Sequence, residues 1–165
     1  MAGQGVVLRP PRNALDPAAV RWWRAQWLAL TAVPVVVLAV LGVLIAPARL
    51  WLLAAAAGLA AVGALCAALL PPWWYRVHRW EVTDDAVYVR TGYFWRESRI
   101  APMSRIQTVD TVRGPLERSF ALATVTVTTA SAKGALRITG LHHEVAADLA
   151  ERLTRITGAT PGDAT

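Results

Sequence analysis

Two long apolar runs without a charged side chain constrain this chain more than any other feature. The first extends from Ala25 to Ala48 and the second from Leu50 to Tyr75, with Arg49 alone between them. A helix rises about 1.5 Å per residue, so roughly 20 apolar residues cross a hydrocarbon core about 30 Å thick. Both runs are long enough, and we therefore predict two transmembrane helices, over residues 25–48 and 49–72.

Two other interpretations of these runs are a buried helical hairpin in a soluble protein and a cleaved signal peptide. Too few residues follow the second run to wrap two apolar helices of this length. Ala46-Pro47-Ala48 resembles a small-x-small cleavage site, but the apolar stretch before it is longer than the core of a signal peptide. Hydrophobic residues also make up 55% of the 165 residues, which is high for a soluble protein. The membrane interpretation is therefore favoured.

Positive charge flanks both outer ends of the predicted hairpin. Residues 1–24 carry four arginines against one aspartate, and residues 76–118 carry eight arginines against six acids. Under the positive-inside rule, we expect a multi-pass protein of the inner (plasma) membrane with both termini in the cytoplasm and the turn at residues 46–49 outside. The apolar runs contain no charged side chain to relay protons or ions, so transport is not expected.

Aromatic and arginine side chains gather at the predicted cytoplasmic end of each run. Tryptophan and tyrosine rings combine an apolar body with a polar group and favour the headgroup level, where arginines attract anionic lipid. We expect Pro71-Pro72 to end the second helix. The predicted membrane-interface residues are Trp22, Trp23, Trp27, Trp73, Trp74, Tyr75, Arg76 and Arg79. Packing against the domain that follows is the alternative role for these rings, and above all for Trp80.

From Arg79 onward the pattern changes to short alternating runs separated by turn residues, which predicts antiparallel strands. The predicted strands are residues 79–83, 86–91, 94–100, 105–113, 124–129 and 136–139. An apolar stripe from Val145 to Ile156 has helical spacing, and we expect Gly158 to end that helix.

The predicted architecture is a membrane-anchored α+β protein. It comprises an N-terminal segment (1–24), the two-helix transmembrane hairpin, an antiparallel β-barrel or sandwich with a C-terminal amphipathic helix (76–158) and a flexible tail (159–165).

Several segments of the second half occur in a familiar order. They are R-W-E-V-T-D-D at 79–85, R-T-G at 90–92, P-M-S-R-I-Q-T-V at 102–109, R-G-P-L-E-R at 113–118 and L-A-T-V at 122–125. In order and spacing they resemble the bacterial pleckstrin-homology-like (PH-like) domain of YdbS-like membrane proteins. The resemblance implies a seven-stranded barrel-like sheet with a C-terminal helix, placed after two transmembrane helices. It implies no catalytic residues.

The residue patterns do not indicate catalysis, a metal or a cofactor. His142 and His143 are adjacent and point to different sides of a helix, and Cys66 is a single cysteine inside the second apolar run. No nucleophile motif or glycine-rich phosphate loop occurs in the sequence. We therefore expect a non-catalytic protein without cofactors.

The expected partners are the lipid bilayer and a membrane protein, either a second copy of this chain or another protein. A lipid-sensing module and an accessory subunit of a membrane enzyme or transporter are the alternatives. The turn Thr83–Ala86 carries two aspartates, where PH domains in eukaryotes often hold phosphoinositides with basic residues, so phosphoinositide binding is not expected. Nucleic acid is not expected either, because no basic stripe continues across the predicted sheet.

The turn between the second and third predicted strands is aromatic where polar residues are usual. It contains Tyr93, Phe94 and Trp95, followed by Arg96. We expect this tip to contact the membrane or a partner. Packing of Phe94 and Trp95 into the core or onto a neighbouring strand is the alternative.

Overall fold

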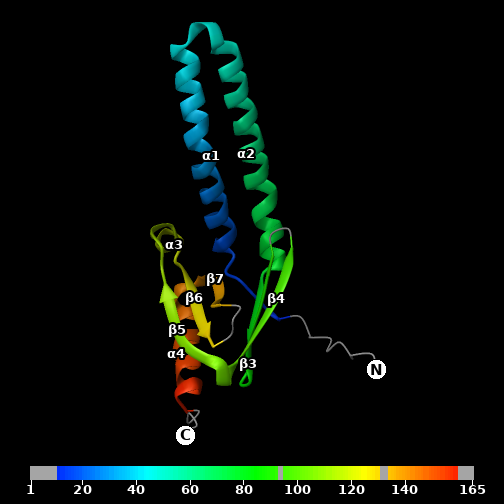
Figure 1. Cartoon of the computed structure of the whole chain (residues 1–165), viewed down its shortest axis with the longest axis vertical. Helices are drawn as coiled ribbons and strands as arrows, with labels where there is room; N and C mark the ends of the chain where they lie inside the picture. The colour runs from blue at the N-terminus through cyan, green and yellow to red at the C-terminus, as the bar shows by residue number, and fades with distance from the viewer. Residues whose placement is uncertain (1–10, 93–94, 131–133, 160–165) are drawn as a thin grey trace, which may run out of the picture. The chain divides into compact units, whose positions relative to one another are not determined.

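The computed structural model describes residues 11–92, 95–130 and 134–159, and it divides into two compact units. The first unit, Pro17–Tyr75, is a helical hairpin. The second unit joins the chain before Pro17 to the chain after Tyr75, and we call it the sheet domain. The sheet domain is therefore built from one segment that precedes the hairpin in the sequence and one that follows it (Figure 1).

The hairpin consists of α1 (Ala18–Leu44) and α2 (Arg49–Val77), joined by a 3-10 turn at Ala46–Ala48. Both helices are long and apolar enough to cross a membrane. Arg49 donates from Nε to the carbonyl of Gly42 at 3.4 Å and from Nη2 to that of Val43 at 3.3 Å. The last carbonyls of a helix have no partner within it, and the guanidinium of Arg49 satisfies two of them at the end of α1.

The expectation that Pro71-Pro72 ends the second helix is wrong, because α2 continues through both prolines to Val77. Each proline removes one backbone donor, which helices in membranes accommodate better than helices in water. Pro71 is also fully buried, so packing of its ring offsets part of the lost hydrogen bonding. The last turn of α2 consequently carries Trp73, Trp74 and Tyr75 on a helix rather than on a loop.

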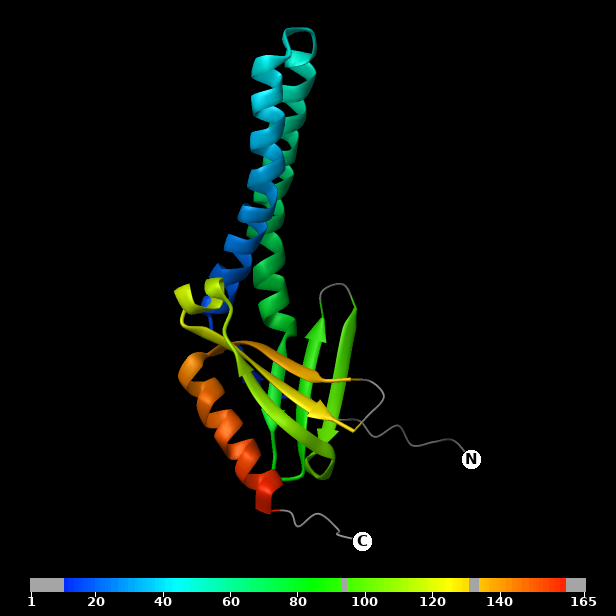
Figure 2. The same cartoon turned by 60° about the vertical axis from the view of Figure 1, so that its left-hand side comes forward.

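The sheet domain contains two antiparallel sheets (Figure 2). The first has the order β1 (Asn13–Ala14), β2 (Arg79–Val82), β3 (Ala86–Gly92), β4 (Arg96–Pro102), and the second has the order β5 (Ile106–Val112), β6 (Leu122–Thr129), β7 (Leu136–His142). A 3-10 turn, η2 (Met103–Arg105), joins β4 to β5, and a short helix, α3 (Pro115–Ser119), joins β5 to β6. The C-terminal helix, α4, spans His143–Ala159 and includes Gly158, which was expected to end it.

Alternation along the strands places one apolar face of each sheet inside the domain. On β6, Val125 and Val127 are fully buried while the threonines that alternate with them are only half-buried. Helix α4 packs on β5 and β6 through its apolar stripe. The buried positions of the sheets and α4 include Val87, Val89, Leu122, Leu136, Ile138, Leu141, Ala146, Leu149 and Leu153.

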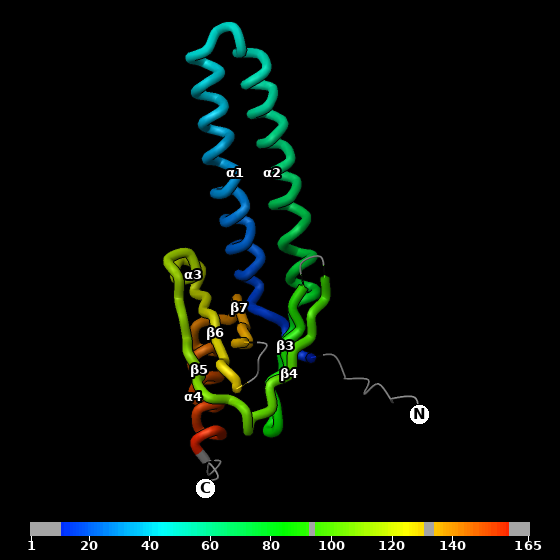
Figure 3. The backbone as a smooth tube through the Cα atoms, in the orientation of Figure 1, coloured from blue at the N-terminus to red at the C-terminus, as the bar shows by residue number. Residues whose placement is uncertain are grey.

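The predicted α+β architecture is confirmed, but the sheets do not close into a barrel. In the described part of the chain, β4 pairs only with β3, and β7 pairs only with β6. Figure 3 shows the two sheets as separate layers, joined through the bend between β4 and β5. A sandwich with an open side is therefore the better description.

Strand β1 was not predicted, and it ties the N-terminal segment to both sheets. Asn13 and Ala14 pair with Trp80 and Arg79 of β2, and Trp80 Nε1 also donates to the carbonyl of Ala14 at 3.1 Å. The amide of Asp16 then donates to the carbonyl of Gly140 in β7 at 3.0 Å. Leu15, between these contacts, is 5% exposed. We call residues 13–16 the N-terminal clasp.

Candidate interaction surfaces

Both membrane-capable helices connect to the same end of the sheet domain. Ala14 lies opposite Arg79, so the chain leaves β1 toward α1 at the end where β2 receives it from α2. The hydrogen bond from Asp16 to Gly140 extends this end to the second sheet. We call it the attachment end. It is defined entirely by contacts within the sheet domain.

The β3–β4 turn lies at the attachment end. Arg90 pairs with Arg79 and Gly92 pairs with Arg96, so β3 ends and β4 begins beside the start of β2. A Cβ atom on Gly92 would lie 3.1 Å from Cγ1 of Val77 and 2.7 Å from the carbonyl oxygen of Trp95. Gly92 therefore allows the turn to approach the last residue of α2.

The aromatic turn presents an exposed tryptophan. Trp95 is 83% exposed and Arg96 is also exposed. The alternative that Trp95 packs into the core therefore does not describe this structure. Tyr93 and Phe94 lie outside the described residues, so their predicted contact stays a prediction.

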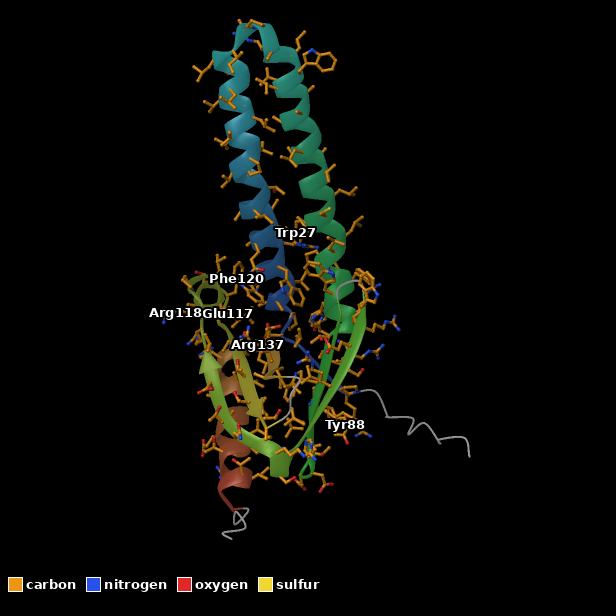
Figure 4. The ribbon with its side chains drawn as sticks, in the orientation of Figure 1. Trp27, Tyr88, Glu117, Arg118, Phe120 and Arg137 are labelled. Atoms are coloured by element: carbon orange, nitrogen blue, oxygen red, sulfur yellow. The ribbon has the colours of Figure 1, made fainter. Side chains whose placement is uncertain are left out.

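Helix α3 is a second exposed feature of the attachment end, and the sequence patterns did not indicate it. Leu122 pairs with His142 and Val112 pairs with Thr124, so the β5–β6 connection that holds α3 lies at this end of the second sheet. Leu116 is 44% exposed, and Arg118 is exposed beside it. Figure 4 shows Arg118 and Phe120 on the α3 turn, with Tyr88 nearer the opposite end of the domain.

A buried carboxylate holds α3 in place. Glu117 is 7% exposed, and its carboxylate accepts hydrogen bonds from the amide of Gly114 at 2.7 Å and from Oγ1 of Thr124 at 2.6 Å. Glutamate at the third position of a helix commonly satisfies the backbone donor at the helix start in this way, and proline suits the first position, as Pro115 does here. The R-G-P-L-E-R segment thus contains the N-terminal cap of α3, and a hydrogen bond from Thr124 anchors it to β6.

A groove follows β4 on the open side of the sandwich. It is lined by Glu97, Ser98, Arg99, Ile100 and Ala101 of β4 and by Thr129, Gly134 and Leu136 around the β6–β7 connection. Arg99 crosses the groove, pairing with Glu97 at 2.7 Å and donating to the carbonyl of Ala135 at 3.4 Å. Ile100 is 40% exposed although it is apolar. We call this groove the β4 seam.

The predicted membrane-interface residues differ in burial. Trp22, Trp23 and Trp74 are buried, and the ring centroids of Trp23 and Trp74 lie 5.9 Å apart across the two helices. Trp27 also contacts Trp74, at 6.2 Å between centroids, and is half-buried like Tyr75. Trp73 (41% exposed) and Arg76 are exposed on the last turns of α2, while Arg79 is half-buried in β2. Trp23 and Trp27 of α1 thus contact Trp74 of α2, a role that the sequence did not predict.

The titratable side chains that the structure describes form no cluster suited to a metal. Among residues 11–92, 95–130 and 134–159, no group of three His, Cys, Asp or Glu side chains could hold a metal ion. The rings of His142 and His143 lie 4.5 Å apart, and His142 Nδ1 lies 3.7 Å from the carboxylate of Glu144. At the opposite end of the domain, Asp84 in the acidic β2–β3 turn pairs with Arg152 of α4 at 3.2 Å.

Comparison with known proteins identifies the class of protein. The family model for the bacterial PH domain matches residues 24–157, and the chain therefore belongs to the bacterial PH domain family. The match includes most of the helical hairpin as well as the strands and α4.

A curated relative extends this assignment to the membrane. The chain is 28% identical over 156 residues to the UPF0699 transmembrane protein YdbS of Bacillus subtilis (strain 168), covering 93% of this chain and 97% of the relative. No solved structure matches the chain. Together with two helices suited to span a membrane, the family and the relative define a transmembrane protein with a PH-like module.

Proposed function

We propose that this protein is a non-catalytic, two-pass protein of the inner membrane, and that its PH-like sheet domain assembles with another membrane protein or with a second copy of itself in the cytoplasm. The β4 seam supports this proposal. Sheet edges that pair on one side only offer unpaired backbone donors and acceptors, and a strand of a partner adds to such an edge through main-chain hydrogen bonds.

The N-terminal clasp supports the proposed topology. A strand that precedes α1 pairs with a strand that follows α2, so both outer ends of the hairpin belong to one domain. If α1 and α2 each cross the bilayer once, that domain lies on one side of it. The excess of arginine on both flanks of the hairpin favours the cytoplasmic side.

Anchoring makes a weak contact sufficient for assembly. Two molecules held in the same membrane meet at a high effective concentration, so the seam does not need high affinity in solution. An apolar side chain that lines the seam, Ile100, is exposed and so accessible to a partner strand. Specificity then comes from the side chains around the edge, including the ion pair between Arg99 and Glu97.

Site-specific crosslinking in intact membranes tests the assembly proposal. A photo-crosslinking amino acid replaces Ser98, which is exposed in the seam, and in a matched sample it replaces Ala147, which is exposed on α4. We expect a discrete crosslinked product from position 98 only, and its mass distinguishes a second copy from another protein. Equal yields from the two positions would contradict the proposal.

A charge placed in the seam tests the same contact by mutation. Ile100→Lys adds a desolvation penalty to an edge that a partner must cover, so we expect the position-98 product to be lost. Val145→Lys is the matched control, because Val145 on α4 is 42% exposed against 40% for Ile100. Persistence of the product in Ile100→Lys would show that the partner binds elsewhere.

A further inference from the structure

Exposed apolar side chains of the sheet domain are concentrated at the attachment end. Among the described residues of this domain, five large hydrophobic side chains are exposed: Trp95, Ile100, Val112, Leu116 and Val145. Ile100 lies in the β4 seam, whereas Trp95 belongs to the β3–β4 turn and Val112 and Leu116 to the end of β5 and α3. Trp95 is the most exposed of them, at 83%.

Short connections keep this end close to the points where the two helices leave a bilayer. Only His78 separates α2 from β2, and residues 15–17 separate β1 from α1. An extended residue spans at most about 3.6 Å, so neither connection allows the attachment end to move far from its helix. Gly92 lies against Val77, which brings the β3–β4 turn beside the end of α2.

Basic groups accompany the exposed apolar side chains. Arg96 follows Trp95 and Arg118 lies two residues after Leu116, and both arginines are exposed. The acidic neighbours of these arginines are engaged elsewhere: Glu97 pairs with Arg99, and Glu117 is buried against Gly114 and Thr124. An apolar ring beside a guanidinium suits the headgroup layer of an anionic bilayer, where the ring remains partly wet and the cation meets lipid phosphate.

We propose that Trp95 of the β3–β4 turn and Arg96 at the start of β4, together with Leu116 and Arg118 of α3, form a membrane-contact surface that binds the anionic headgroup layer at the attachment end. This surface rests on α1 and α2 crossing the bilayer and does not depend on the β4 seam having a partner. Because β4 begins at Arg96, contact of the turn with lipid fixes the orientation of the seam relative to the membrane.

Fluorescence of single labels in the full-length protein tests the surface. In a Cys66→Ala background, Trp95→Cys, Leu116→Cys and Ser104→Cys each carry an environment-sensitive dye, and the proteins are reconstituted into vesicles that contain shallow spin-labelled lipid. Ser104 is the control, because η2 lies at the opposite end of the domain, where Met103 donates its amide to Asp85. We expect blue-shifted, quenched emission at positions 95 and 116 and water-like emission at position 104.

Lipid composition and charge reversal complete the test. Quenching at position 116 is expected to be stronger in vesicles of phosphatidylcholine with phosphatidylglycerol than in phosphatidylcholine alone, and Arg96→Glu with Arg118→Glu is expected to abolish that difference. Emission at 95 and 116 as water-like as at 104 would overturn the proposal, because side chains in the headgroup layer are shielded from bulk water. Equal quenching in both lipids would overturn the role of the arginines. Hydrogen exchange of β6 amides checks that each variant is folded, and crosslinking from position 98 reports the seam separately.

Discussion

At the scale of single residues, hydrogen bonds make it possible for the carboxylate of Glu117 to be buried in the sheet domain. Its two carboxylate oxygens accept hydrogen bonds from a backbone amide and a hydroxyl, so the charge is solvated by the protein. One of these donors, Thr124, belongs to β6, which lies in the core of the second sheet. The position of α3 is thereby linked to the stability of that sheet.

We predict that Glu117→Ala lowers the free energy of unfolding of the sheet domain by about 2 kcal/mol, because it leaves the amide of Gly114 without its acceptor. Hydrogen exchange of β6 amides in the full chain should then accelerate by about 30-fold if it proceeds through global opening of the domain. Glu117→Gln should cost less, since its carbonyl oxygen can still accept from Gly114 while the Thr124 hydroxyl rotates. Glu151→Gln, in an exposed pair with Arg155, is the control; an equal effect there would contradict a special role for Glu117.

At the scale of elements, two glycines differ in their role in the helical hairpin. A Cβ atom on Gly63 would lie 2.7 Å from Cγ2 of Thr31 in α1, whereas one on Gly58 would meet nothing within 4 Å. Close approach of two helices in a membrane depends on such small residues, because packing replaces the hydrophobic effect as the source of association. Gly63 therefore lies at the contact between α1 and α2, and Gly58 does not.

We predict that Gly63→Ala weakens the association of the two helices by about 1–3 kcal/mol, the usual cost of adding a methyl group to a tightly packed contact. Unfolding by sodium dodecyl sulfate in mixed micelles, followed through tryptophan fluorescence, to which the Trp23–Trp74 contact between the helices contributes, measures this change. Gly58→Ala is the matched control and should be neutral or slightly stabilising, because alanine favours the helix. Identical midpoints for the two variants would show that Gly63 does not limit the approach.

Elements with a long periodic pattern were predictable from the sequence, and short elements were not. Val125 and Val127 alternate with threonines, and the stripe from Val145 to Ile156 has helical spacing, so β6 and α4 were identified. Strand β1 has two residues and α3 has five, which is too short for any period to show. The prediction that Pro71-Pro72 ends the second helix was wrong because packing of the buried Pro71 ring outweighs the local tendency of proline to break a helix.

The candidate surfaces also divide into a part that the sequence pattern indicated and a part that it did not. The exposed turn at Trp95 and Arg96 was indicated by aromatic residues where polar ones are usual, whereas Leu116 and Arg118 gave no local signal. Their exposure depends on Glu117 rather than Leu116 being the residue of α3 that turns inward. The β4 seam required knowledge of which strands do not pair, and alternation within one strand does not contain that information.

At the scale of the whole molecule, the clasp and the distribution of arginine lead to one topology. We predict that a cysteine at Pro47, in a Cys66→Ala background, reacts with a membrane-impermeant maleimide added outside intact cells. A cysteine at Ser104 should react only after the membrane is opened, because the sheet domain is expected in the cytoplasm. Labelling of position 104 in intact cells would reverse the orientation, and labelling of both positions would show that the hairpin does not cross the bilayer twice.

The clasp also affects how the protein is made. Ala14 and Trp80, which share a hydrogen bond, are 66 positions apart, and the entire hairpin lies between them. The first strand thus leaves the ribosome long before its neighbour, and its sheet cannot be completed until the intervening helices have been synthesised. Maturation of the domain is consequently coupled to insertion of the hairpin, and a fragment that begins after α2 would lack an edge strand and the buried side chain of Leu15.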